Sequence, residues 1–179
     1  MGLTQIQKIQ LNKQVDKILH TPGNQPQAEK NQLEMAFVLD CSASEEFLKT
    51  TLTDAVAGLK AHDKIFQNVR SNVVYWGREQ LTTEVMPMSF LQMGKPFTQE
   101  AYKTVDNAPI FDNLCAYLKL YHARSKCILV FTEKEYEIQD AKQVYDSLNP
   151  FLKTKLLLVT PQNFISGTVI NMEMLQEKC

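Results

Sequence analysis

The chain has 179 residues, of which 44% are hydrophobic and 22% are charged, and its formal net charge is -1 at pH 7. These proportions are typical of a globular domain with a substantial core, and they exclude a disordered chain. The balanced charge gives no reason to expect nucleic acid or an anionic membrane as a partner. No segment approaches the roughly 18 apolar residues that a membrane span needs.

Residues 1–32 are expected to form a helix followed by a linker. Four apolar residues share one face of a helix predicted over residues 3–20: Leu11, Val15, Ile18 and Leu19. Residues 21–32 contain two prolines and a glycine, which is typical of a linker or long loop. We therefore predict a compact domain over residues 33–179. The helix either folds back onto this domain or binds another chain.

The compartment is predicted from the opening residues and the cysteines. The opening residues are polar and lack the apolar core of a secretory signal. The four cysteines show no zinc-binding spacing: Cys41, Cys115, Cys127 and Cys179. Reduced thiols in a cytoplasmic protein are the expectation.

From residue 33 onward, apolar runs alternate with helix-like segments. Strands are expected over residues 35–39, 71–76, 81–90, 127–132 and 155–160. Helices are expected over residues 45–59, 98–105, 114–121, 138–148 and 170–177. Continuous apolar strands are buried on both faces, so the pattern predicts an α/β fold. The expected architecture is a doubly wound, mostly parallel, Rossmann-like sheet with helices on both faces. The short connection after the second strand predicts one antiparallel edge strand.

Three oxygen-bearing side chains follow the first strand: Asp40, Ser42 and Ser44. They are expected at the carboxyl end of that strand, which is the edge where ligands bind in open α/β sheets. A carboxylate and two hydroxyls suit a hard divalent cation. Alternatively, these side chains only accept hydrogen bonds from backbone N–H groups and cap the following helix.

The order of these elements around the D-x-S-x-S loop resembles a von Willebrand factor A (VWA) domain over about residues 33–160. In that family D-x-S-x-S begins a metal-ion-dependent adhesion site (MIDAS). A threonine ahead of a helix and an aspartate after the next core strand complete that site. Here Ala108 precedes Pro109 at the threonine position, and Glu133 stands at the aspartate position. The resemblance therefore implies a site for Mg²⁺ or Mn²⁺ formed by four residues: Asp40, Ser42, Ser44 and Glu133.

The resemblance also implies a non-enzymatic protein-interaction module. A protein partner would dock on the loops at 40–45, 104–112 and 133–137, where an Asp or Glu carboxylate of the partner could bind the ion. Lys134 replaces the glycine common in the family and adds a positive charge that disfavours a cation. A degenerate, metal-free VWA-like scaffold is therefore an alternative. The sequence specifies neither the partner nor the oligomeric state.

An enzyme is the remaining alternative. A strand that ends in Asp40 is similar to phosphotransferases of the haloacid dehalogenase type, in which this aspartate is the nucleophile. Those enzymes need a second aspartate two residues later, where this chain has Ser42. The six glycines form no nucleotide-binding loop. We therefore predict neither catalytic residues nor an organic cofactor.

Overall fold

Six strands form one sheet in the order β3-β2-β1-β4-β5-β6, in a computed structural model that describes residues 2–22, 24 and 32–179. The strands are β1 (Leu33–Asp40), β2 (Val69–Trp76), β3 (Leu81–Pro87), β4 (Cys127–Phe131), β5 (Leu156–Val159) and β6 (Phe164–Ser166). The four central strands are parallel, and β3 is an antiparallel edge strand. This confirms the predicted doubly wound, mostly parallel sheet. The sequence analysis missed β6, a short antiparallel strand at the other edge.

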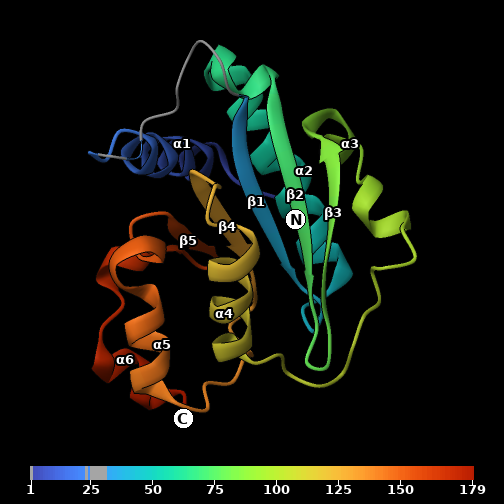
Figure 1. Ribbon diagram of the computed structural model, residues 1–179. Helices are drawn as coiled ribbons and strands as arrows, with labels where there is room; N and C mark the ends of the chain where they lie inside the picture. The colour runs from blue at the N-terminus through green and yellow to red at the C-terminus, as the bar shows by residue number, and fades with distance from the viewer. Residues whose placement is uncertain (1, 23, 25–31) are drawn as a thin grey trace.

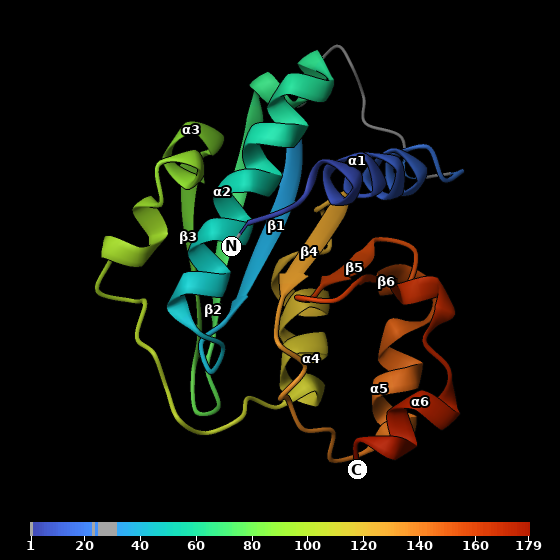
Figure 2. The same ribbon diagram turned by 180° about the vertical axis from the view of Figure 1, so that it is seen from behind.

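Helices cover both faces of the sheet, which gives the molecule three layers (Figures 1 and 2). One layer contains α1 (Gln5–Leu19), α2 (Glu45–His62) and α3 (Met88–Gln92). The other contains α4 (Phe111–Tyr121), α5 (Ala141–Ser147) and α6 (Met172–Glu177). Single turns of 3-10 helix lie at Lys64–Gln67, Lys95–Thr98 and Gly167–Val169, and a π-helical turn follows α5 at Leu148–Leu152. None of the helices in the described part of the chain has both the length and the apolarity to cross a bilayer.

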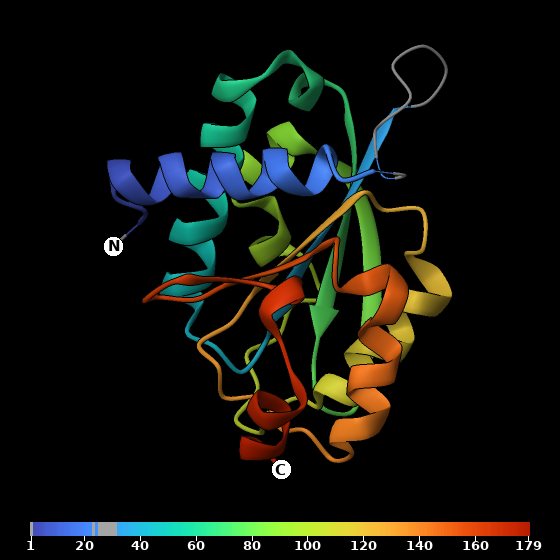
Figure 3. The ribbon, with the colours of Figure 1, turned by 90° about the vertical axis from the view of Figure 1, so that its left-hand side faces the viewer.

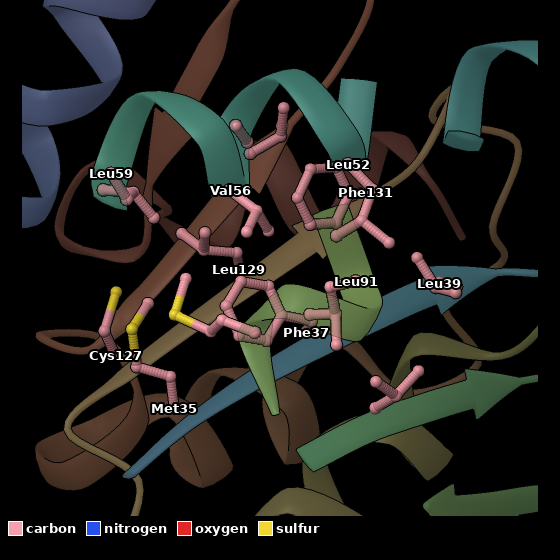
Figure 4. Close-up of a cluster of buried hydrophobic side chains, with 14 of the residues drawn as sticks. Met35, Phe37, Leu39, Leu52, Val56, Leu59, Leu91, Cys127, Leu129 and Phe131 are labelled. Carbon is pink, nitrogen blue, oxygen red and sulfur yellow. The ribbon is translucent and has the colours of Figure 1, made fainter. Parts of the chain in front are cut away.

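The side chains of β1 show why its sequence is apolar throughout. Met35, Phe37 and Leu39 pack in the core on the side of α1, α2 and α3, beneath α2 in Figure 4. Ala36 and Val38 pack in the second core, on the side of α4, α5 and α6. Neighbouring residues of a strand point to opposite faces, so a strand covered on both faces needs apolar residues at every position.

Several element boundaries differ from the sequence-based prediction. The strand predicted over residues 81–90 ends at Pro87, after which α3 begins. Proline lacks the N–H that a further ladder hydrogen bond requires, so it suits the end of an edge strand. The helix predicted over residues 98–105 was wrong, because helical structure there is limited to the turn at Lys95–Thr98.

The first helix folds back onto the domain. The four apolar residues predicted for one face of the helix are buried in the core, and the helix lies across α2 (Figure 3). The backbone N–H of Leu3 donates to Oδ2 of Asp54 on α2 at 2.9 Å, and Asp16 pairs with His62 at the end of α2 at 2.7 Å. Of the two possibilities that the sequence left open, folding back and binding another chain, the structure shows the first. Most of the linker predicted over residues 21–32 lies outside the described residues, and the domain boundary at residue 33 stays a prediction.

Two alanine substitutions on α1 test whether this helix belongs to the cooperative core. Leu11 is 1% exposed and Ile9 is 49% exposed. Leu11→Ala should lower the free energy of unfolding by about 2–5 kcal/mol, because it leaves a cavity under the helix. Ile9→Ala should change it by less than about 0.5 kcal/mol. Urea unfolding measures both values, and equal midpoints for the two variants would contradict the docking of α1.

Candidate functional site

The carboxylate of Asp40 joins the ends of two neighbouring strands. Asp40 is the last residue of β1 and is 0% exposed. Its Oδ1 accepts hydrogen bonds from the backbone N–H of Ser42 at 2.9 Å and from the Ser42 hydroxyl at 2.6 Å. Its Oδ2 accepts a hydrogen bond from the hydroxyl of Thr132, directly after β4, at 2.6 Å. The loops that follow β1 and β4 are therefore held together by one buried side chain.

A second hydrogen bond joins the same two loops. The backbone N–H of Ser44 donates to Oε1 of Glu133 at 2.9 Å. The hydroxyl of Ser44 accepts a hydrogen bond from the backbone N–H of Phe47 at 3.2 Å and so caps α2. A capping oxygen stabilises the start of a helix by satisfying one of its free N–H groups. The capping role considered from the sequence is therefore present at Ser44.

Lys134 has a backbone conformation that favours glycine. Its φ is 71°, in the left-handed region that a side chain disfavours by roughly 1–2 kcal/mol. Its N–H donates to the hydroxyl of Thr132 at 3.0 Å, so the turn is fixed by the same threonine that binds Asp40. The turn after β4 is therefore tied to the buried carboxylate through Thr132.

The loop before α4 reaches the same rim. The backbone N–H of Val105 donates to the carbonyl oxygen of Cys41 at 3.0 Å. Arg78, after β2, donates from Nη1 to the carbonyl of Ala108 at 2.9 Å and pairs with Glu137 at 3.0 Å. Three loops therefore meet at the carboxyl edge of the sheet. Ala108 brings no hydroxyl to it, at the position where the resemblance predicts a threonine.

The structure brings together all four residues predicted for the metal site: Asp40, Ser42, Ser44 and Glu133. Their role as ligands stays a prediction. Within the described residues, no group of three or more His, Cys, Asp or Glu side chains is arranged to hold a metal ion. The predicted site has two carboxylates and two hydroxyls, so it is not a group of three such side chains. The sequence analysis missed Thr132, although its place directly after a core strand was a signal.

Burial dominates the electrostatics of the rim. Desolvation raises the pKa of Asp40, while the hydrogen bonds from Ser42 and Thr132 lower it and the nearby charge of Glu133 raises it. Burial, with the charge of Asp40 as a smaller cause, raises the pKa of Cys41 to about 11. The Cys41 thiol is therefore protonated at neutral pH, which makes it a poor nucleophile.

The donor chemistry of the rim fits a small divalent cation. The hydroxyl of Ser42 donates a hydrogen bond to Asp40, so its oxygen lone pairs stay available to a cation. Ser44 and Glu133, joined through the Ser44 N–H, contribute a second hydroxyl oxygen and a carboxylate to the same two loops. Desolvation raises the pKa of the buried Asp40 carboxylate, and a neighbouring positive charge would stabilise its ionised form.

An open groove of about 1030 Å³ lies next to these loops. The hairpin between β2 and β3 forms one wall and the loop before α4 forms the other. The lining includes Cys41, Tyr75, Arg78, Glu84, Lys103 and Val105. The groove thus begins at the loop that follows Asp40, which extends the surface available to a partner.

Comparison with models of protein families, with curated proteins and with solved structures finds no match for this chain. The three-layer α/β architecture comes from the structure itself. The resemblance to VWA domains therefore stays a prediction, supported by the sequence pattern around Asp40.

The raised pKa of Asp40 predicts the pH dependence of its contribution to stability. A folded-state pKa above the ordinary value of 3.8 means that the folded chain holds this proton more tightly than the unfolded chain. The contribution is therefore complete below pH 3.8 and is lost as the pH rises through the raised pKa. The stability advantage of the native protein over Asp40→Asn, measured by urea unfolding, should shrink as the pH rises above 3.8. An advantage that grows with pH would contradict the raised pKa.

Proposed function

We propose that the chain is a non-enzymatic protein-interaction module of VWA type, whose partner docks at the carboxyl edge of the sheet. The observation that carries this proposal is the joining of three loops into one rim around Asp40. Hydrogen bonds that already order the three loops lower the entropic cost of association. The adjacent groove adds concave surface for the same partner.

In this proposal, Mg²⁺ or Mn²⁺ is held by the hydroxyls of Ser42 and Ser44 together with Glu133. When bound, the ion supplies a positive centre to which an Asp or Glu carboxylate of the partner can coordinate. Asp40 acts as a positioning residue, because it accepts hydrogen bonds from the N–H and the hydroxyl of Ser42 and so fixes the loop. Glu133 is positioned by the N–H of Ser44.

The environment of Asp40 supports a binding role over the phosphotransferase alternative. A nucleophilic carboxylate must be ionised and must reach its substrate. Asp40 is fully buried, and each of its oxygens accepts a hydrogen bond from a neighbouring hydroxyl. That enzyme class needs a second aspartate at position 42. Here this position holds a serine whose hydroxyl donates a hydrogen bond to Asp40.

A metal-free scaffold is the second candidate, and two residues favour it. Ala108 brings no oxygen ligand from its side chain to the rim, and Lys134 places a positive side chain next to Glu133. In that case the rim would bind its partner through direct polar contacts, with Arg78 and Glu137 at its side. Chelator sensitivity separates the two candidates.

Titration with Mn²⁺ tests the ion-dependent form of the proposal. Ser42→Ala should weaken Mn²⁺ binding about tenfold or more, because it removes a ligand oxygen and frees the Asp40 carboxylate to shift. The matched control is Ser89→Ala, since Ser89 is exposed on α3 at the opposite edge of the sheet. Isothermal titration calorimetry gives the dissociation constants. Equal affinities for native protein, Ser42→Ala and Ser89→Ala would contradict the site.

Capture of binding proteins tests the interaction role. The immobilised full chain, exposed to lysate of the cells that express it, should retain a partner that EDTA releases. Ser42→Ala should fail to retain that partner, whereas Ser89→Ala should retain it. Retention that resists EDTA but is lost in Arg78→Ala would favour the metal-free scaffold. Capture of the same proteins by all variants would contradict docking at this rim.

A further inference from the structure

A lysine from the last helix lies at the same rim as Asp40. Lys178 directly follows α6, and its Nζ donates a hydrogen bond to the carbonyl oxygen of Lys134. The same Nζ lies 4.5 Å from the centre of the Tyr136 ring. A cation over an aromatic face is attracted by the negative charge of the π system. Two residues of the loop after β4 therefore hold the ammonium group.

A short chain of hydrogen bonds links this lysine to the buried carboxylate. The N–H of Lys134 donates to Thr132 at 3.0 Å, and Thr132 donates to Asp40 at 2.6 Å. The Nζ of Lys178 donates to the carbonyl oxygen of the same Lys134 residue. Burial lowers the pKa of Lys178, while the charges of Glu135 and Asp40 raise it and that of Lys134 lowers it. The ammonium therefore lies within the electrostatic field of the candidate site.

The position of Lys178 is fixed from two sides. On α6, Leu175 is 3% exposed and belongs to the core cluster beside α5. At the rim, Tyr136 stacks on Phe111 with ring centres 5.0 Å apart and lies 5.8 Å from Trp76. These aromatic rings form a rigid floor for the ammonium group, so the docking of α6 delivers a positive charge to a defined place.

We propose that Lys178 is an internal cation of this site, and that docking of α6 at the rim opposes binding of a divalent ion at the Asp40 loop. The proposal rests on the proposed function, because it describes the regulation of the same site. An ammonium group and a divalent ion repel each other, and burial strengthens that repulsion relative to water. Each therefore weakens the binding of the other by the same factor.

The rim then has two forms. With Lys178 docked, its positive charge lies on the Lys134 carbonyl and in the field of the Asp40 carboxylate. With a divalent ion bound, Lys178 leaves Tyr136 and the contact between α6 and the loop after β4 loosens. A partner that supplies a carboxylate to the ion favours the second form, because ligands shift a two-state equilibrium toward the state that they bind.

Removal of this one charge tests the competition. Lys178→Met keeps an unbranched side chain over Tyr136 and removes the ammonium, so it should bind Mn²⁺ about fivefold to tenfold more tightly than the native protein. Lys178→Arg keeps the charge and should bind like the native protein. Lys64→Met is the matched control, because Lys64 is an exposed lysine just before β2, at the opposite edge of the sheet. Titration calorimetry of the full chain measures all four affinities.

Hydrogen exchange of the unmutated chain provides a second test that does not depend on a variant. Saturating Mn²⁺ should increase amide exchange in residues 172–178 and leave α1 unchanged. Ser42→Ala at the same Mn²⁺ concentration should show no increase. If Mn²⁺ leaves amide exchange in α6 unchanged or slows it, the proposed competition between Lys178 and the ion would be overturned.

The outcomes separate this inference from the proposed function. Equal Mn²⁺ affinity of the native protein and Lys178→Met would overturn the competition and leave the ion site intact. Binding by Lys178→Met alone would support both. Absence of binding by either protein would overturn the ion site and the competition together.

Discussion

The buried carboxylate of Asp40 organises the carboxyl edge of this sheet. Transfer of a carboxylate out of water is costly unless hydrogen bonds compensate for its lost hydration. Here the backbone N–H and hydroxyl of Ser42 and the hydroxyl of Thr132 supply that compensation. These bonds join the loop after β1 to the turn after β4, and the hydrogen bond from the Ser44 N–H to Glu133 joins the same two segments beside them.

The order of the strands explains why the rim lies where it does. From β1 the chain proceeds to β2 on one side, while β4 lies on the other side of β1. Connections that leave two neighbouring strands in opposite directions open a crevice between their carboxyl ends. Asp40 and Thr132 lie at this switch point. The topology thus provides the place, and the local sequence provides the chemistry.

Most of the fold could be predicted because its strands are buried on both faces. The apolar runs that became β1, β4 and β5 have a clear local signal, and D-x-S-x-S directly after the first strand indicated the rim. In contrast, β6 has three partly exposed residues, which gives it no apolar pattern. The position of Lys178 could not be predicted, since its contacts with Lys134 and Tyr136 join segments that are distant in sequence.

The central claim is that the loops around Asp40 form an oxygen-lined site for a divalent ion. Anomalous diffraction at the manganese edge, from crystals of the full chain grown with MnCl₂, tests it most directly. The account predicts one strong anomalous peak bounded by the hydroxyl oxygens of Ser42 and Ser44 and the carboxylate of Glu133. A map with no peak at this position, in crystals that contain manganese elsewhere, would contradict it.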